Sequence, residues 1–277
     1  MTTSADYCYE RTTSPFLAMT RGLFHFLHTS PNRETGVAVR QLSILPLGTL
    51  HLPTGRLLIE DPFKSLRPHL NRAFVVEPGE YRVVQTVARI GEDEHAHQSR
   101  SAYLSLVLDE ARLAERRHWQ QQQMEHRQDP QVDEALRSPF FPELPRDSFS
   151  EQQWKRMAKS SVSVLTGTVA LADQDRFELL MPSDQHDMGE GWLETVFDHG
   201  LPGSWFDALD ASNPLPVGSA QVQLPQGKAT DQVILCRTGW GDGQYPVSLE
   251  HSQDGHPIAL HVDFGLIPSD PMLALRA

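Results

Sequence analysis

The feature that most constrains the fold is the repeated interruption of short apolar runs by proline and glycine. In the first half of the chain these runs occupy residues 36–42, 48–52, 56–59, 81–88 and 101–108. Turn signals that contain both proline and glycine separate them at 53–55 and 77–79. Short strands at a spacing of about 8–12 residues with such breaks are typical of antiparallel β-sheet. Residues 112–123 fit either helix or strand.

The C-terminal third contains a glycine-rich turn followed by two apolar runs. The turn motif consists of Gly239, Trp240, Gly241, Asp242, Gly243, Tyr245 and Pro246. Glycine and aspartate tolerate the positive φ that tight turns need. Residues 245–249 and 258–264 are predicted to form a hairpin, which we expect to pair with strands from the first third of the chain. Residues 161–172 also fit a strand, with Gly167 at a turn or bulge. The sequence therefore predicts an α+β fold, predominantly antiparallel β-sheet with a few short helices.

The segment 128–147 divides the predicted fold. It contains four pairs in which proline follows another residue, and proline disfavours helix at the residue before it. We therefore predict a Pro-rich connection between an N-terminal β-rich sub-lobe, residues 1–127, and a C-terminal α+β sub-lobe, residues 148–277. The two are expected to pack as one compact unit. Ser148 and Glu151 have the spacing of a capping box that opens a short helix.

Composition excludes several classes of protein. With 24 basic and 36 acidic residues the net charge is −12, which argues against a general nucleic-acid binder. No basic-then-apolar leader and no apolar run of about 18 residues is present, so we expect neither secretion nor membrane insertion, and a cytoplasmic location. Cys8 and Cys236 are the only cysteines, which excludes a disulfide scaffold and a cysteine zinc site. Cys236 lies in an apolar run and is expected to be a buried strand thiol.

The negative charge is concentrated in one segment. Between Asp173 and Pro214 the chain has ten acidic residues and one basic residue, Arg176, so this segment carries nine of the twelve net negative charges. If residues 189–200 form a helix, three of the acids stack at i, i+4 and i+8 on one face, opposite an apolar face. These three acids are Glu190, Glu194 and Asp198.

This acidic segment favours docking of a basic protein, because opposed charge speeds encounter and rejects wrong partners. Trp205 and Phe206 follow the acidic face and are predicted to anchor such a partner, since aromatic residues commonly dominate interface energetics. The alternative interpretation is a solvated surface that confers solubility. A second copy of this chain, pairing through an exposed β edge, is the alternative partner.

Four ordered motifs resemble the bacterial "domain of unknown function" 4241 family. They lie at residues 54–63, 76–81 and 167–173, and at 239–246 together with 262–264. The resemblance extends from about Gly48 to Ile267, most of the chain. It implies a β-rich bacterial protein and supplies no chemistry.

One set of residues could perform catalysis. Asp61, Asp242, His261 and Asp263 could converge as carboxylates with an imidazole, which suits metal-assisted hydrolysis. The alternative is structural, because aspartate beside proline or glycine caps turns, and His261 and Asp263 share one strand face. His95 and His97 have a spacing found in some metal sites, but no third ligand lies in register with them.

No nucleophile elbow, phosphate-binding loop, dinucleotide fingerprint or zinc-protease motif occurs. The sequence therefore favours a non-enzymatic cytoplasmic binding protein, with immunity-type neutralisation of a basic toxin or effector as its role. No metal, cofactor, nucleic-acid partner or membrane partner is expected. The alternative function is a metal-assisted hydrolase or nuclease that uses the Asp/His set.

Overall fold

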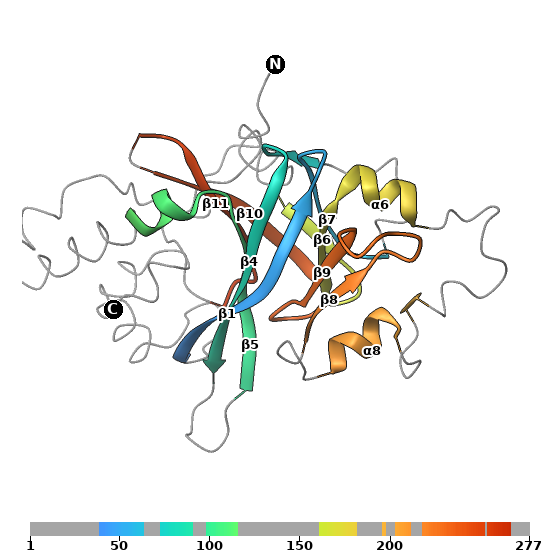
Figure 1. The fold of residues 1–277 in the computed structure, drawn as a ribbon. Helices are drawn as coiled ribbons and strands as arrows, with labels where there is room; N and C mark the ends of the chain where they lie inside the picture. Colours follow the sequence, from blue (N-terminus) through green and yellow to red (C-terminus); the bar gives the residue numbers. More distant parts are fainter. Residues whose placement is uncertain are drawn as a thin grey trace, which may run out of the picture. The chain divides into compact units, whose positions relative to one another are not determined.

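The computed structural model of the chain describes residues 39–63, 73–90, 98–115, 161–181, 196–197, 203–211, 218–252 and 254–266. Within these residues the strands form two sheets (Figure 1). The first has the order β1 (Val39–Leu52), β4 (Gly79–Ile90), β5 (Gln98–Val107), β11 (Pro257–Asp263), β10 (Gly243–His251) and β6 (Ser161–Val164). The second has the order β3 (Ala73–Val75), β2 (Arg56–Glu60), β7 (Thr168–Asp173), β9 (Gln232–Arg237) and β8 (Ser219–Gln223). Two short helices, α6 (Gln174–Leu180) and α8 (Trp205–Asp210), follow β7 and precede β8. The fold is α+β with antiparallel sheet dominant, as predicted.

The chain divides into two compact units. Unit 1 contains the described residues within Leu45–Gln85 and Val162–Tyr245, and unit 2 contains those within Thr86–Ser161 and Pro246–Ala277 together with the start of β1. Each unit therefore draws on chain from both sides of the predicted connection at 128–147, which itself lies outside the described residues.

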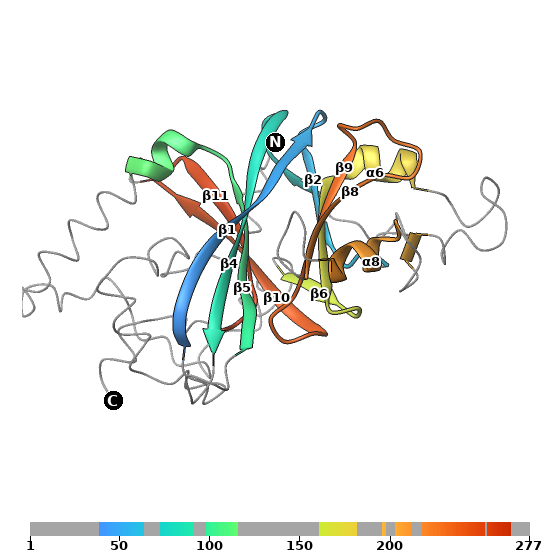
Figure 2. The same ribbon diagram turned by 60° about the horizontal axis from the view of Figure 1, so that its bottom comes forward.

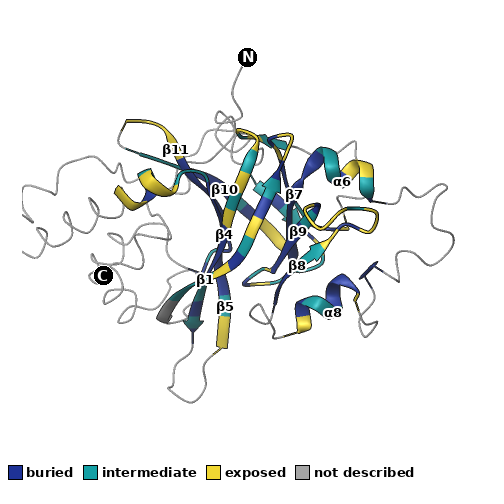
Figure 3. Ribbon diagram, viewed as in Figure 1, coloured by how far each residue is buried: buried dark blue, intermediate teal, exposed yellow. Residues whose placement is uncertain are grey.

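The five-stranded sheet lies wholly in unit 1. The pairs β2–β3, β2–β7, β7–β9 and β8–β9 are all antiparallel. All six residues of β7 and four of the six in β9 are buried, so these strands appear dark blue along most of their length in Figure 3. A continuous buried run, in place of alternation, indicates that both faces of a strand are covered. Helix α6 packs against β2 and β7, and α8 packs against β8 and β9.

Helices α6 and α8 each begin at a side-chain cap. The Asp173 carboxylate accepts a hydrogen bond from Arg176 N at the start of α6, and Ser204 Oγ accepts one from Asp207 N at the start of α8. Such caps satisfy backbone donors that have no partner within the helix. They fix where each helix leaves the sheet.

The paired residues of the predicted C-terminal hairpin lie in unit 2. Strands β10 and β11 pair antiparallel, with Val247 opposite Val262 and Leu249 opposite Leu260. The second partner of β11 is β5, which lies just beyond the first third of the chain (Figure 2). Residues 110–115 are helical, while 116–123 and the capping box at 148–151 lie outside the described residues. Among the described residues, no helix combines the length and the apolarity that a bilayer span requires.

Candidate functional site

Asp61, the first residue of the alternative catalytic set, is fully buried in unit 1. Its Oδ1 accepts a hydrogen bond from Phe63 N at 2.9 Å. Its Oδ2 accepts three more, from Leu165 N at 2.7 Å, Thr166 N at 2.8 Å and Thr166 Oγ1 at 2.9 Å. An ionised carboxylate has about four acceptor sites, so these four hydrogen bonds occupy all the acceptor sites of Asp61. The carboxylate ties the end of β2 to the turn between β6 and β7.

The other three residues of the alternative catalytic set are divided between the two units. Asp242 is exposed on the glycine-rich turn of unit 1. Asp263 is buried in unit 2, where its Oδ1 accepts a hydrogen bond from Gly265 N at 2.9 Å. The described residues contain no group of three or more histidine, cysteine, aspartate or glutamate side chains that could hold a metal ion. His95 and His97 lie outside the described residues.

His261 belongs to a buried network that spans three strands of unit 2. Its Nδ1 lies 2.8 Å from Ser105 Oγ on β5, and its Nε2 lies 3.1 Å from Glu250 Oε2 on β10. Sheet register creates the first contact, because His261 and Ser105 are directly opposite each other. A serine, an imidazole and a carboxylate in a row also characterise nucleophilic catalysis. Here, however, Ser105 is 0% exposed and His261 2% exposed, so the network is closed to a substrate in this structure.

The predicted anchors Trp205 and Phe206 lie in the core of unit 1. They are 3% and 8% exposed, and both belong to the hydrophobic cluster beneath α6 and α8. The ring centroid of Trp205 lies 5.2 Å from that of Phe197 and 6.4 Å from that of Phe177. Phe206 stacks on Phe63 at 5.8 Å. These rings hold the helices on the sheet and are not presented at the surface.

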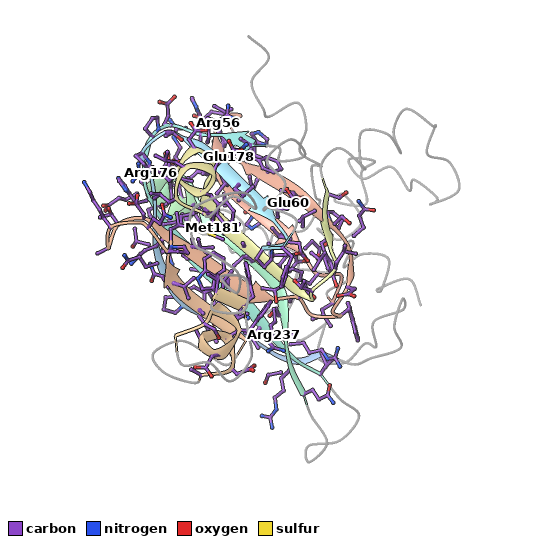
Figure 4. The ribbon with its side chains drawn as sticks, turned by 90° about the vertical axis from the view of Figure 1, so that its right-hand side faces the viewer. Arg56, Glu60, Arg176, Glu178, Met181 and Arg237 are labelled. Carbon is purple, nitrogen blue, oxygen red and sulfur yellow. The ribbon has the colours of Figure 1, made fainter. Side chains whose placement is uncertain are left out.

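Two of the five described acids in the acidic segment pair with arginines from elsewhere in unit 1. Arg56 Nε binds Asp175 Oδ1 at 2.9 Å, and Arg237 binds Asp210. Arg176, the one basic residue of the segment, binds Asp231 outside it. Figure 4 labels these three arginines. Asp173 is buried and accepts hydrogen bonds from Thr54 N at 2.9 Å and Thr54 Oγ1 at 2.8 Å. The predicted docking face of Glu190, Glu194 and Asp198 lies outside the described residues.

Two adjoining turns of unit 1 are held by hydrogen bonds and carry exposed apolar side chains. The first is the turn at residues 165–167, held by Asp61; the second is the glycine-rich turn at residues 238–242. Thr238 N donates to Gly167 O at 2.8 Å, which joins the two turns. A Cβ added at Gly167 would lie 3.5 Å from Gly241 Cα, so a side chain at this position would contact the second turn.

Side-chain hydrogen bonds fix the glycine-rich turn. Thr238 Oγ1 donates to Gly241 O at 2.6 Å and accepts from Gly241 N at 2.9 Å. The Tyr245 hydroxyl donates to the same carbonyl at 2.7 Å, and burial raises the pKa of this hydroxyl. Gly241 has φ +85°, a left-handed conformation that glycine adopts without strain. The motif residues therefore shape a turn, as predicted.

We define the two-turn platform as the exposed residues Leu165, Trp240 and Asp242. Leu165 is 63% exposed and Trp240 is 37% exposed, and both are among the few large apolar side chains exposed in the described part of the chain. The turn was visible in the sequence as a glycine-rich motif. Leu165 was missed, because only the contact between Gly167 and Thr238 brings its turn beside Trp240.

A family model described as "Protein of unknown function (DUF4241)" matches residues 50–262, well over half of the chain. This match confirms the resemblance carried by the four motifs. No curated protein and no solved structure matches the chain. The family description assigns no activity, so the function has to be argued from the residues themselves.

Proposed function

We propose that this chain, which belongs to the DUF4241 family, is a non-enzymatic binding protein for a basic protein partner. The partner class that fits its charge is a toxin or effector that the chain neutralises, as an immunity protein does. The observation that supports the proposal most directly is that the buried Asp61 carboxylate is fully hydrogen-bonded. Its carboxylate would have to give up hydrogen bonds to Leu165 and Thr166 before it could bind a metal ion or accept a proton.

The same reasoning applies to the other buried groups. Asp263 accepts from the backbone at Gly265, and His261 is engaged at both ring nitrogens. Carboxylates that bind local backbone amides support a scaffold role, whereas a hydrolytic site needs groups that converge in an open cleft. These residues support binding over hydrolysis.

The chemistry of the partner follows from charge. The segment 173–214 carries ten acids and one base, and only part of that excess is neutralised by Arg56 and Arg237. Five of the acids lie outside the described residues, including Glu190, Glu194 and Asp198. Their spacing at i, i+4 and i+8 suits a helix face that meets lysines and arginines, which a nuclease uses against phosphate. Opposed charge then raises the association rate.

A capture experiment with designed variants tests the proposal. The tagged chain is used to recover a partner from the organism that encodes it, and the association rate is measured at low and high salt. The variant with Glu190→Lys, Glu194→Lys and Asp198→Lys should slow association by about tenfold or more and flatten its salt dependence. The control variant places three lysines at exposed glutamates elsewhere, Glu77, Glu80 and Glu115, and should change the rate much less.

Two results would overturn the proposal in different ways. An association rate and salt dependence unchanged by the triple reversal would show that the partner does not dock on this acidic face. Turnover of a nucleotide, an ester or a nucleic acid by the purified chain would replace the binding class by the hydrolase alternative.

A further inference from the structure

We propose that the two-turn platform is a receptor for a basic side chain, an arginine or lysine that a protein partner presents beside an apolar residue. This inference rests on the proposed function and assigns a second contact surface to it. In the proposed complex the cation lies over the Trp240 ring and against the Asp242 carboxylate, and the apolar residue covers Leu165.

The residue types of the platform suit that ligand. Tryptophan is the aromatic side chain that attracts a cation most strongly to its ring face. A carboxylate two positions away adds a charge-assisted acceptor for the same group. An exposed leucine on the adjoining turn gives apolar area, and interface hot spots combine aromatic anchors with such neighbours. Trp240, Asp242 and Leu165 therefore provide three contacts of different chemistry.

Charge complementarity supports a cationic occupant. Three other exposed aspartates in the described residues each have an arginine partner within their own unit: Asp175 with Arg56, Asp210 with Arg237, and Asp254 with Arg112. Asp242 forms no ion pair with a described residue. Its negative charge therefore remains available for a cation from outside the chain.

The platform is also preorganised. The carbonyl of Gly241 accepts hydrogen bonds from Thr238 Oγ1 and Tyr245 OH, and Asp61 holds the backbone of Leu165. A surface that is already ordered loses little conformational entropy on binding. The hydrogen bonds thus keep the Trp240 turn and the Leu165 turn together before a partner arrives.

Peptide titration tests this receptor. The probe is a short capped peptide that alternates leucine and arginine, followed through the indole N–H resonance of Trp240, which a Trp240→Phe variant assigns. As the arginine peptide is added, the chemical shift of this resonance should change and reach a plateau. Asp242→Asn should weaken the affinity by about fivefold, and Trp240→Ala, followed by another resonance of the platform, by about tenfold. Asp175→Asn, at an exposed aspartate already paired with Arg56, should leave the affinity unchanged.

Control peptides decide between ligand chemistries. A peptide with glutamate in place of arginine should not bind, and one with serine in place of leucine should bind more weakly. Equal binding of the glutamate peptide, or affinity unaffected by Asp242→Asn in a variant shown to be folded, would overturn the receptor. A shift caused by anionic lipid vesicles but not by the arginine peptide would also overturn it.

The failure of this inference can be separated from that of the proposed function. If binding of a captured partner is weakened by changes at Glu190, Glu194 and Asp198 but not by changes at Trp240 and Asp242, the proposed binding function holds. The proposed receptor is then wrong. If the arginine peptide binds as expected and no basic partner responds to the triple reversal, the receptor stands and the acidic docking face is wrong.

Discussion

Arg176 binds Asp231 through two parallel hydrogen bonds, from Nε to Oδ1 at 2.8 Å and from Nη2 to Oδ2 at 2.9 Å. Lys228 N also donates to Asp231 Oδ2 at 2.8 Å. This bidentate pair joins helix α6 to the turn between β8 and β9, although the two residues are 55 positions apart. The guanidinium of Arg176 lowers the pKa of Asp231 from an ordinary 3.8 to about 2.

This pair makes part of the stability dependent on pH. A carboxylate whose pKa is lower in the folded state contributes stability above its unfolded pKa, and loses it as the pH falls through the folded value. Asp231→Asn should therefore lower the free energy of unfolding by about 1 kcal/mol at neutral pH, since Arg176 is partly exposed. Urea titrations should show this difference shrinking between pH 4 and pH 2. A difference independent of pH would contradict the assignment.

Gly55 is required by its backbone. It has φ +69°, and a Cβ at this position would lie 2.3 Å from the carbonyl oxygen of Val76. Gly55→Ala should therefore lower the free energy of unfolding by about 2–4 kcal/mol, measured by urea denaturation. Gly255→Ala is the matched control, because Gly255 has φ +83° but no atom within 4 Å of the added Cβ. It should lose only about 1 kcal/mol. Equal losses would show that the contact with Val76 is unimportant.

The network around His261 should behave as a coupled structural unit. His261→Ala removes the imidazole contacts of the Glu250 carboxylate and the Ser105 hydroxyl, in a buried environment where the loss of polar contacts is destabilising. We expect a loss of about 3 kcal/mol. The double variant His261→Ala, Glu250→Ala should lose about 1–2 kcal/mol less than the sum of the single variants. Additive losses in thermal or urea unfolding would mean that the two side chains do not interact.

The strands and the C-terminal hairpin could be predicted because their evidence is local. Two apolar runs on either side of Gly255 indicated β10 and β11, and the buried position of Cys236 followed from its apolar run. The hydrogen bonds that occupy the Asp61 carboxylate could not be predicted in this way. Its partners Leu165 and Thr166 lie 104 and 105 residues away, so only the folded chain shows that the carboxylate is a turn cap.

The charge of the sequence alone could not show which acids are paired, because their partners are also distant in the chain. The segment 173–214 contains a single basic residue, yet the fold brings Arg56 to Asp175 from 119 positions away. Trp205 and Phe206 were predicted as partner anchors, although a local signal for burial existed. Ser204 caps a helix on which Trp205 and Leu209 are four residues apart, the spacing of an apolar face that packs on a sheet.

The claim that this chain is a binding scaffold depends most directly on Asp61, and urea unfolding of Asp61→Asn tests it. An amide at this position replaces one acceptor by a donor that faces Leu165 N and Thr166 N, or leaves Phe63 N without its partner. If the carboxylate is structural, the free energy of unfolding should fall by about 2–3 kcal/mol relative to wild type. A carboxylate held for catalysis is commonly neutral or destabilising to the fold. Unchanged or increased stability of Asp61→Asn would therefore contradict the account.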